Sequence, residues 1–235
     1  REPDEHRDRV GHAQVEPLGR HDAQLEHRLV TPNASLVDLD AAVALATEHD
    51  LAALVVSPWL LKAARRALGR SHLALGTVIG NGQGGQLLSV KAFEASKCLE
   101  QGATQIDFAL NAGALVSGLD DIVHNDLLAV IDMAHSALAV AGVIVEAAPM
   151  RDELLTRACR LAERAGADYV ITSTGDASAK RTVDRVALLR DSVGPRVQVK
   201  AAGRFRTAGE LQAAAEADEE LLRSARDATG VVAVA

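Results

Sequence analysis

The sequence contains few aromatic residues: one tryptophan, one tyrosine and three phenylalanines among 235 residues. Its formal net charge is −7 and it has no long basic run, so it lacks both the stacking surface and the positive patch with which proteins bind nucleic acids. Its apolar runs are too short to cross a bilayer, and the charged segment 1–24 contains no apolar signal core. We therefore expect a cytoplasmic protein whose partners include neither nucleic acid nor a membrane.

Cysteine is also scarce. Cys98 and Cys159 fall in helix-like segments without an evident base partner, so we expect buried free thiols rather than a disulfide or a nucleophile. No group of residues has zinc-ligand spacing. The glycine-rich segment 80–85 lacks the lysine and hydroxyl of a Walker loop and has no dinucleotide fingerprint. We expect no metal and no cofactor, and an ordinary turn at segment 80–85.

Short apolar runs alternate with amphipathic segments from residue 25 onward. The runs predict strands and the amphipathic segments predict helices. The predicted strands lie at 25–32, 52–56, 73–79, 104–110, 142–146, 168–175, 197–203 and 221–224. A doubly wound open sheet would also alternate, but eight units in this length favour a single α/β domain, a (β/α)8 TIM barrel. We assign the barrel to residues 25–235 and a short polar, partly helical extension to residues 1–24.

Two strands carry ionisable residues among apolar neighbours. Lys200 ends the strand at 197–203, where burial would lower its pKa toward neutrality and free the amine as a nucleophile or base. Asp107 lies inside the strand at 104–110, and a carboxylate there needs a partner or stays protonated. Taken alone, Lys200 is also consistent with a solvated strand end and Asp107 with a structural salt bridge, so both interpretations stay open.

Four segments, 90–94, 107–118, 169–175 and 197–203, resemble the motifs of the deoxyribose-phosphate aldolase family. The family reads Val-Lys-Thr-Ser-Thr-Gly where this chain reads Val-Ile-Thr-Ser-Thr-Gly, so Ile171 stands in the place of the family's Schiff-base lysine. Isoleucine can neither attack a carbonyl nor carry a proton. The resemblance covers residues 25–226 and implies a barrel in which the inherited imine mechanism cannot run unchanged.

The resemblance also implies roles for the two ionisable residues. In the family, the lysine that matches Lys200 tunes the Schiff-base lysine, and the aspartate that matches Asp107 relays protons. We therefore expect Asp107 to be a general acid/base paired with Lys200, whose strand neighbours that of Ile171. Without a neighbouring cation at position 171, the pKa of Lys200 should rise.

Further positions match the family's substrate site. An Asp-x-Thr pattern on the first strand becomes Glu26 and Arg28 here, and because adjacent strand residues point to opposite faces, only one of Glu26 and His27 can face the interior. In the phosphate site, arginines replace small residues, and arginine can clamp a carboxylate or phosphate bidentately. The expected substrate-binding residues are Glu26, Arg28, Asn111, Ile171, Thr172, Thr174, Gly203, Arg204, Arg223 and Ser224.

Three functions follow from these residues. The first is an aldolase-like lyase for an altered, anionic carbonyl or sugar-phosphate-like substrate, with Lys200 and Asp107 in imine or acid–base chemistry. The second is a repurposed, imine-free enzyme that catalyses cyclisation, elimination or proton transfer. The third is a non-catalytic protein that binds a ligand. A dimer is common in the family, so a homodimer is a further expectation of the resemblance.

Overall fold

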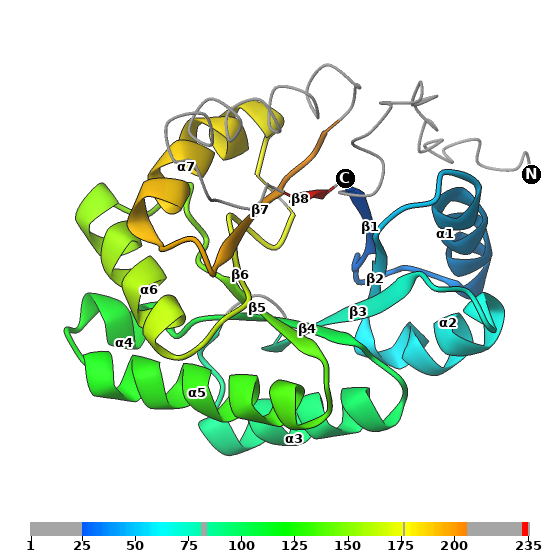
Figure 1. Ribbon diagram of the computed structural model, residues 1–235, viewed down its shortest axis with the longest axis horizontal. Coiled ribbons are helices and arrows are strands. Elements are labelled where there is room, and N and C mark those ends of the chain that lie inside the picture. Colours follow the sequence, from blue (N-terminus) through cyan, green and yellow to red (C-terminus); the bar gives the residue numbers. More distant parts are fainter. Residues whose placement is uncertain (1–24, 81–83, 176, 206–231, 235) are drawn as a thin grey trace, which may run out of the picture.

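The computed structural model describes residues 25–80, 84–175, 177–205 and 232–234. In these residues eight parallel strands form a closed barrel in the order β1 to β8 (Figure 1). The strands are β1 Leu25–Leu29, β2 Ala53–Val56, β3 Ala74–Ile79, β4 Gln105–Ala109, β5 Val140–Ile144, β6 Tyr169–Ile171, β7 Gln198–Ala202 and β8 Val232–Val234. The predicted (β/α)8 barrel is confirmed.

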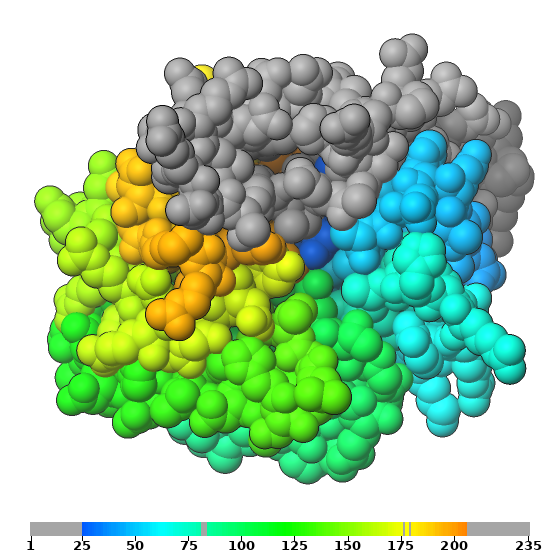
Figure 2. All heavy atoms as spheres, viewed as in Figure 1, coloured from blue at the N-terminus to red at the C-terminus, as the bar shows by residue number. Residues whose placement is uncertain are grey.

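The helices of the described residues lie outside the strands (Figure 1). They are α1 Leu36–Glu48, α2 Leu61–Leu68 with the preceding 3-10 turn η2 Pro58–Leu60, α3 Leu88–Glu100, α4 Ala112–Val116, α5 Asp120–Ser136, α6 Asp152–Arg164 and α7 Ala179–Ser192. In the space-filling view, side chains close the gaps that the ribbon leaves between α5, α6 and the strands (Figure 2). None of these helices is both long enough and apolar enough to span a membrane.

Local sequence signals set several helix ends. Ser35 and Asp38 form a capping box at the start of α1, because each side chain accepts a hydrogen bond from the other residue's backbone N–H. Pro58 begins η2, where a missing N–H costs little. Asn111 directly follows β4, and its side-chain oxygen accepts a hydrogen bond from the N–H of Ala114 at 3.0 Å. This cap starts α4 at the carboxyl end of the strand.

Two apolar clusters stabilise the barrel. The larger one fills the space between strands and helices and includes Leu54 and Phe108. The smaller one lies inside the barrel, where each of β2 to β7 contributes one residue: Val55, Val78, Ala109, Ile144, Ile171 and Ala202. Successive strand residues alternate between these two environments, as the pleat requires. The barrel interior therefore contains one packed apolar layer.

The position of the last strand was predicted wrongly. The strand that closes the barrel is β8, which pairs with Lys200–Ala202 of β7 and with Leu25–Glu26 of β1. The run Val231-Val232-Ala233-Val234 is short and has no alternating pattern, so it gave only a weak strand signal. Segment 221–224, the predicted helix at 207–217 and the extension at 1–24 lie outside the described residues.

The two cysteines are buried free thiols, as predicted. Burial raises the pKa of both Cys98 and Cys159 to about 12, with the nearby Glu94 and Glu163 adding to the rise. Thiols with such pKa values are inert at neutral pH. Both cysteines therefore serve as small core residues.

A buried ion pair outside the barrel ties two helices to β4. Nζ of Lys91 on α3 donates to Oδ2 of Asp126 on α5 at 2.5 Å and to the carbonyl oxygen of Ala109 at 3.3 Å. The side chains of Lys91 and Asp126 are only 1% and 6% exposed. The pair holds the carboxyl end of β4 in place, two residues beyond Asp107.

Breaking this pair should destabilise the protein strongly. Lys91→Met or Asp126→Leu alone would leave one buried charge without a partner, and we expect a loss of about 3–5 kcal/mol in the free energy of unfolding. The double variant Lys91→Met/Asp126→Leu leaves no unpaired charge and should recover much of that loss in the free energy of unfolding. Denaturant unfolding measures all three, with Glu100→Gln in the exposed pair Lys97–Glu100 as the control at less than about 1 kcal/mol. A single variant as stable as the control would contradict the assigned role.

Candidate active site

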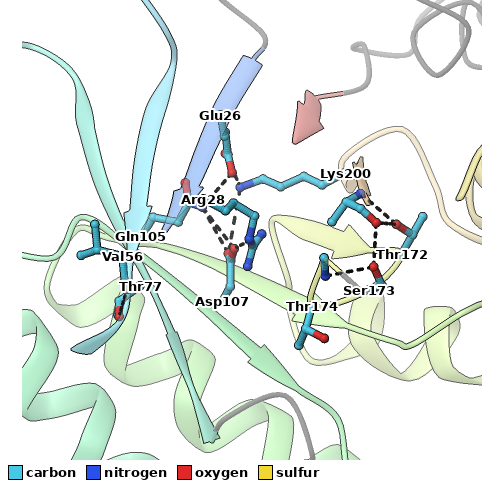
Figure 3. Close-up of polar contacts among 12 residues, drawn as sticks. Glu26, Arg28, Val56, Thr77, Gln105, Asp107, Thr172, Ser173, Thr174 and Lys200 are labelled. Carbon is cyan, nitrogen blue, oxygen red and sulfur yellow. Dashed lines mark hydrogen bonds and ion pairs between the residues drawn. The ribbon is translucent and has the colours of Figure 1, made fainter. Parts of the chain in front are cut away.

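Ionisable side chains from three strands meet inside the barrel (Figure 3). Glu26 and Arg28 come from β1, Asp107 from β4 and Lys200 from β7. Because strand side chains alternate, Glu26 and Arg28 share the inner face while His27 points outward. All four inner side chains are at most 4% exposed. We call Glu26, Arg28, Asp107 and Lys200 the polar cluster.

Lys200 is held between two carboxylates. Its Nζ donates to Oε1 of Glu26 at 2.6 Å and lies 4.0 Å from Oδ1 of Asp107. The other oxygen of Asp107, Oδ2, accepts a hydrogen bond from Nη1 of Arg28 at 3.1 Å. The structure thus brings the predicted partners Asp107 and Lys200 together, but each has a closer partner on β1.

Two uncharged residues that the sequence interpretation did not select complete the surroundings. Nε2 of Gln105 lies 3.4 Å from Oε2 of Glu26 and 3.3 Å from both carboxylate oxygens of Asp107. The ring centroid of Tyr169 lies 3.9 Å from Nζ of Lys200, which is a cation–π distance. Gln105 stands two positions before Asp107 on β4, and Tyr169 stands two positions before Ile171 on β6. Residues two apart on a strand face the same side, so this spacing could have identified both as inward-facing.

The electrostatic balance favours a charged Lys200. Burial lowers the pKa of Lys200, but the carboxylates of Glu26 and Asp107 outweigh burial and raise that pKa above its usual value of 10.5. The prediction that burial would move this pKa toward neutrality was therefore wrong, because it did not include Glu26. Burial also raises the pKa of Asp107, Glu26 adds to the rise, and Lys200 and Arg28 oppose it.

Ile171 lies beside the polar cluster but belongs to the apolar one. It pairs in register with Lys200 on the neighbouring strand, is fully buried and packs in the inner apolar cluster. A Cβ added at Gly142 would lie 2.5 Å from Oδ1 of Asp107 and 2.7 Å from Cδ1 of Ile171. Gly142 therefore gives the carboxylate and the isoleucine room to sit side by side.

The hydroxyl residues after β6 mainly bind backbone. Oγ1 of Thr172 donates to the carbonyl oxygen of Ala202 and accepts from its N–H, and Oγ of Ser173 donates to the same carbonyl (Figure 3). Thr174 donates to Oε1 of Glu146 through both its N–H and its hydroxyl, each at 2.8 Å. Thr172 and Ser173 thus join β6 to β7.

Glu146 is an acidic residue that the sequence interpretation did not select. It follows β5 and has a φ of +47°, which is uncommon for a residue with a side chain. Its carboxylate fixes the backbone at Thr174. No motif marks such a residue in the sequence, because its conformation depends on this long-range contact.

The remaining predicted residues lie apart from the polar cluster in the described structure. Gly203 packs against the start of α7, where a Cβ would lie 2.5 Å from Oγ1 of Thr182. Arg204 is exposed, and its N–H donates to the carbonyl oxygen of Ala177 at 2.8 Å. Asn111 uses its side-chain oxygen as a helix cap. The predicted residues Arg223 and Ser224 lie outside the described residues.

Comparisons with known proteins agree with this architecture. The protein-family model described as DeoC/LacD family aldolase matches residues 19–233. The deoxyribose-phosphate aldolase of Streptococcus gordonii is 38% identical over 189 residues, which are 80% of this chain and 85% of that protein. The deoxyribose-phosphate aldolase of a Geobacillus species is 38% identical over 182 residues, 77% of this chain and 81% of that protein.

Solved structures agree as well. A tetrameric deoxyribose phosphate aldolase from Aeropyrum pernix superposes with a TM-score of 0.75 at 25% identity, covering 91% of this chain and 85% of that chain.

In the described residues, no three His, Cys, Asp or Glu side chains gather as a metal site would require.

Glu26 should control the protonation of Lys200. In Glu26→Gln the largest cause that raises the pKa of Lys200 is lost, so we expect this pKa to fall. NMR titration of the lysine side chains measures it, with the exposed Glu153→Gln as the control. Since the folded-state pKa lies above 10.5, the stability that Lys200 contributes should be complete below about pH 10.5 and lost as pH rises through the folded value. An unchanged pKa in Glu26→Gln would contradict the assigned balance.

Proposed function

The chain belongs to the DeoC/LacD family of aldolases, and we propose that it is a carbon–carbon lyase that cleaves a small β-hydroxy carbonyl compound without an imine. In this proposal Lys200 acts as a fixed cation. The observation that supports it is the fully buried ammonium of Lys200, 2.6 Å from the carboxylate of Glu26.

Imine formation needs an unprotonated amine, and the surroundings of Lys200 oppose one. Its pKa is raised by Glu26 and Asp107 against the effect of burial, so little free amine exists at neutral pH. Removing the proton would also leave two buried carboxylates with one cation fewer, which is costly in a dry interior. Ile171 offers no amine in its place. These points favour chemistry in which Lys200 stays protonated.

A protonated lysine can stabilise an enolate instead. In the cleavage direction, the carboxylate of Asp107 accepts the proton of the substrate's β-hydroxyl group. The bond between the α and β carbons then breaks, and its electron pair enters an enolate whose oxygen faces Nζ of Lys200. Asp107 returns the proton to the α carbon, so that an aldehyde and a second carbonyl compound are released.

The polar cluster suits both steps. An ammonium has three donors, and Glu26 uses one of those of Lys200, so the others can face a developing oxyanion. Fixed charges act strongly where water is excluded, and the four side chains of the polar cluster are at most 4% exposed. The raised pKa of Asp107 brings the carboxyl closer to neutral pH, where a general acid/base works best.

Borohydride trapping tests the imine-free mechanism. We expect no reducible adduct when the wild type is incubated with acetaldehyde or deoxyribose 5-phosphate and borohydride, as read by intact mass and peptide mapping. Ile171→Lys should form an adduct at position 171, because the new amine would lie beside the Lys200 cation, which lowers its pKa. An adduct on Lys200 in the wild type, absent from Lys200→Ala, would sink the fixed-cation mechanism and show an imine-forming aldolase.

Turnover should depend on the two proposed catalytic residues. On a panel of β-hydroxy aldehydes and ketones, Lys200→Met and Asp107→Asn should each lower kcat by about 10²-fold or more. Lys180→Met, on the exposed Lys180–Asp184 pair, is the matched control and should keep full activity. If both variants retain wild-type turnover of a compound that the wild type cleaves, the proposed site is wrong.

A further inference from the structure

Arg28 has one paired and one unpaired edge. Its side chain is only 4% exposed, and Nη1 donates to Asp107 at 3.1 Å. Nε and Nη2 are also buried, but neither has a hydrogen-bond partner among the described residues. In Figure 3 the guanidinium lies beside the carboxylate of Asp107, within the polar cluster.

Unpaired donors on a buried cation are costly, so they call for an explanation. The Nε and Nη2 hydrogens of arginine point in parallel from one edge of a planar group. This edge matches the two oxygens of a carboxylate in a bidentate pair. The edge of Arg28 that has no hydrogen-bond partner among the described residues therefore has the donor geometry of a carboxylate receptor.

We propose that Arg28 binds a carboxylate of the substrate, and that the substrate is the aldol of a 2-oxo acid. This inference rests on the proposed lyase function and names its substrate class. Arg28 and Lys200 contact opposite oxygens of the same carboxylate, Asp107, at 3.1 and 4.0 Å. Both cations therefore lie beside one carboxylate, so a single small substrate can reach Arg28 with its carboxylate and Lys200 with its carbonyl oxygen, and these two groups are adjacent in a 2-oxo acid.

Charge favours a carboxylate over a phosphate at this position. Glu26 and Asp107 oppose Arg28 and Lys200, so the four side chains cancel when all are ionised. A carboxylate adds one negative charge to this buried cluster, whereas a phosphate adds up to two. The unpaired edge offers two donors, which satisfy a carboxylate but leave a phosphate oxygen without a partner.

Arg65 provides a contrast within the same chain. Its Nε and Nη2 are likewise buried without a hydrogen-bond partner in the described structure. Arg65 lies on the outer helix α2, where its side chain packs near Gly102, and no ionisable residue of the polar cluster is on that helix. It is therefore the matched control for Arg28, with the same unpaired donors but no adjacent catalytic group.

The expected reaction is the cleavage of 4-hydroxy-2-oxopentanoate to pyruvate and acetaldehyde. Asp107 takes the hydroxyl proton, the bond between C3 and C4 breaks, and the electron pair forms the enolate of pyruvate. The proton returns to C3, so atoms and charge balance without a co-reactant. The carboxylate stays on Arg28 throughout.

Two measurements test the assignment. Calorimetry with pyruvate should give a dissociation constant that rises about 10- to 100-fold in Arg28→Gln, as expected for losing charged hydrogen bonds. It should rise less in Arg28→Lys and stay unchanged in Arg65→Gln. In turnover, the wild type should prefer 4-hydroxy-2-oxopentanoate over 4-hydroxypentan-2-one, in which a methyl group replaces the carboxylate, and Arg28→Gln should lose that preference. Arg28→Lys keeps a cation beside Asp107 and serves if Arg28→Gln does not fold.

The outcomes separate this inference from the lyase function. If the wild type and the Arg28 variants all cleave 4-hydroxy-2-oxopentanoate and 4-hydroxypentan-2-one equally well, the carboxylate site is overturned and the lyase function stands. Pyruvate binding that depends on Arg28, without cleavage of either compound, supports the site and overturns the lyase. Absence of pyruvate binding together with absence of any preference overturns the assignment of Arg28.

Discussion

The ion pair between Lys200 and Glu26 is the interaction on which the interior of the barrel depends. Each charge is buried, and a buried ion without its partner would destabilise the fold by about 3–5 kcal/mol. Asp107 and Arg28 add a second pair at 3.1 Å. These contacts join β1, β4 and β7. No two of these strands are neighbours in the sheet, although β7 and β1 both pair with β8. The polar cluster therefore both supports the barrel and fixes the chemistry available inside it.

The same carboxylates that allow a lysine to be buried also keep its proton in place. A nucleophilic lysine needs burial or a neighbouring cation without strong acidic partners, whereas Lys200 has Glu26 at 2.6 Å. Because the carboxylates keep Lys200 protonated, its amine is a weak nucleophile. The same protonation makes its ammonium group suitable for stabilising a negative charge. This constraint connects the fold to the proposed enolate chemistry, in which a cation is required and a free amine is not.

The sequence predicts the barrel because the alternation of apolar runs with amphipathic segments is a local pattern, whereas the pairing of Asp107 with Lys200 was predicted from the family resemblance. The sequence did not predict that Glu26 would reach Lys200, a contact between residues 174 positions apart, so the argument from burial gave the wrong direction for the pKa of Lys200. The rise predicted from the missing cation at position 171 has the right direction, but its cause in the structure is Glu26 and Asp107. Gln105, Glu146 and Tyr169 were missed for a similar reason, since their contacts cross strands. The short strand β8 was missed because three residues carry little pattern.

Two of the departures from the family motifs, at positions 28 and 171, lie on either side of Asp107. On the proposed alignment, isoleucine at position 171 removes the family's nucleophilic amine from β6, and arginine at position 28 adds a cation on β1. Asp107 is close to both positions. Its Oδ2 accepts a hydrogen bond from Arg28 at 3.1 Å, and Gly142 leaves room for the side chains of Asp107 and Ile171. In the proposed mechanism these two positions therefore replace an amine nucleophile with a guanidinium that can hold an anion, next to the same carboxylate of Asp107.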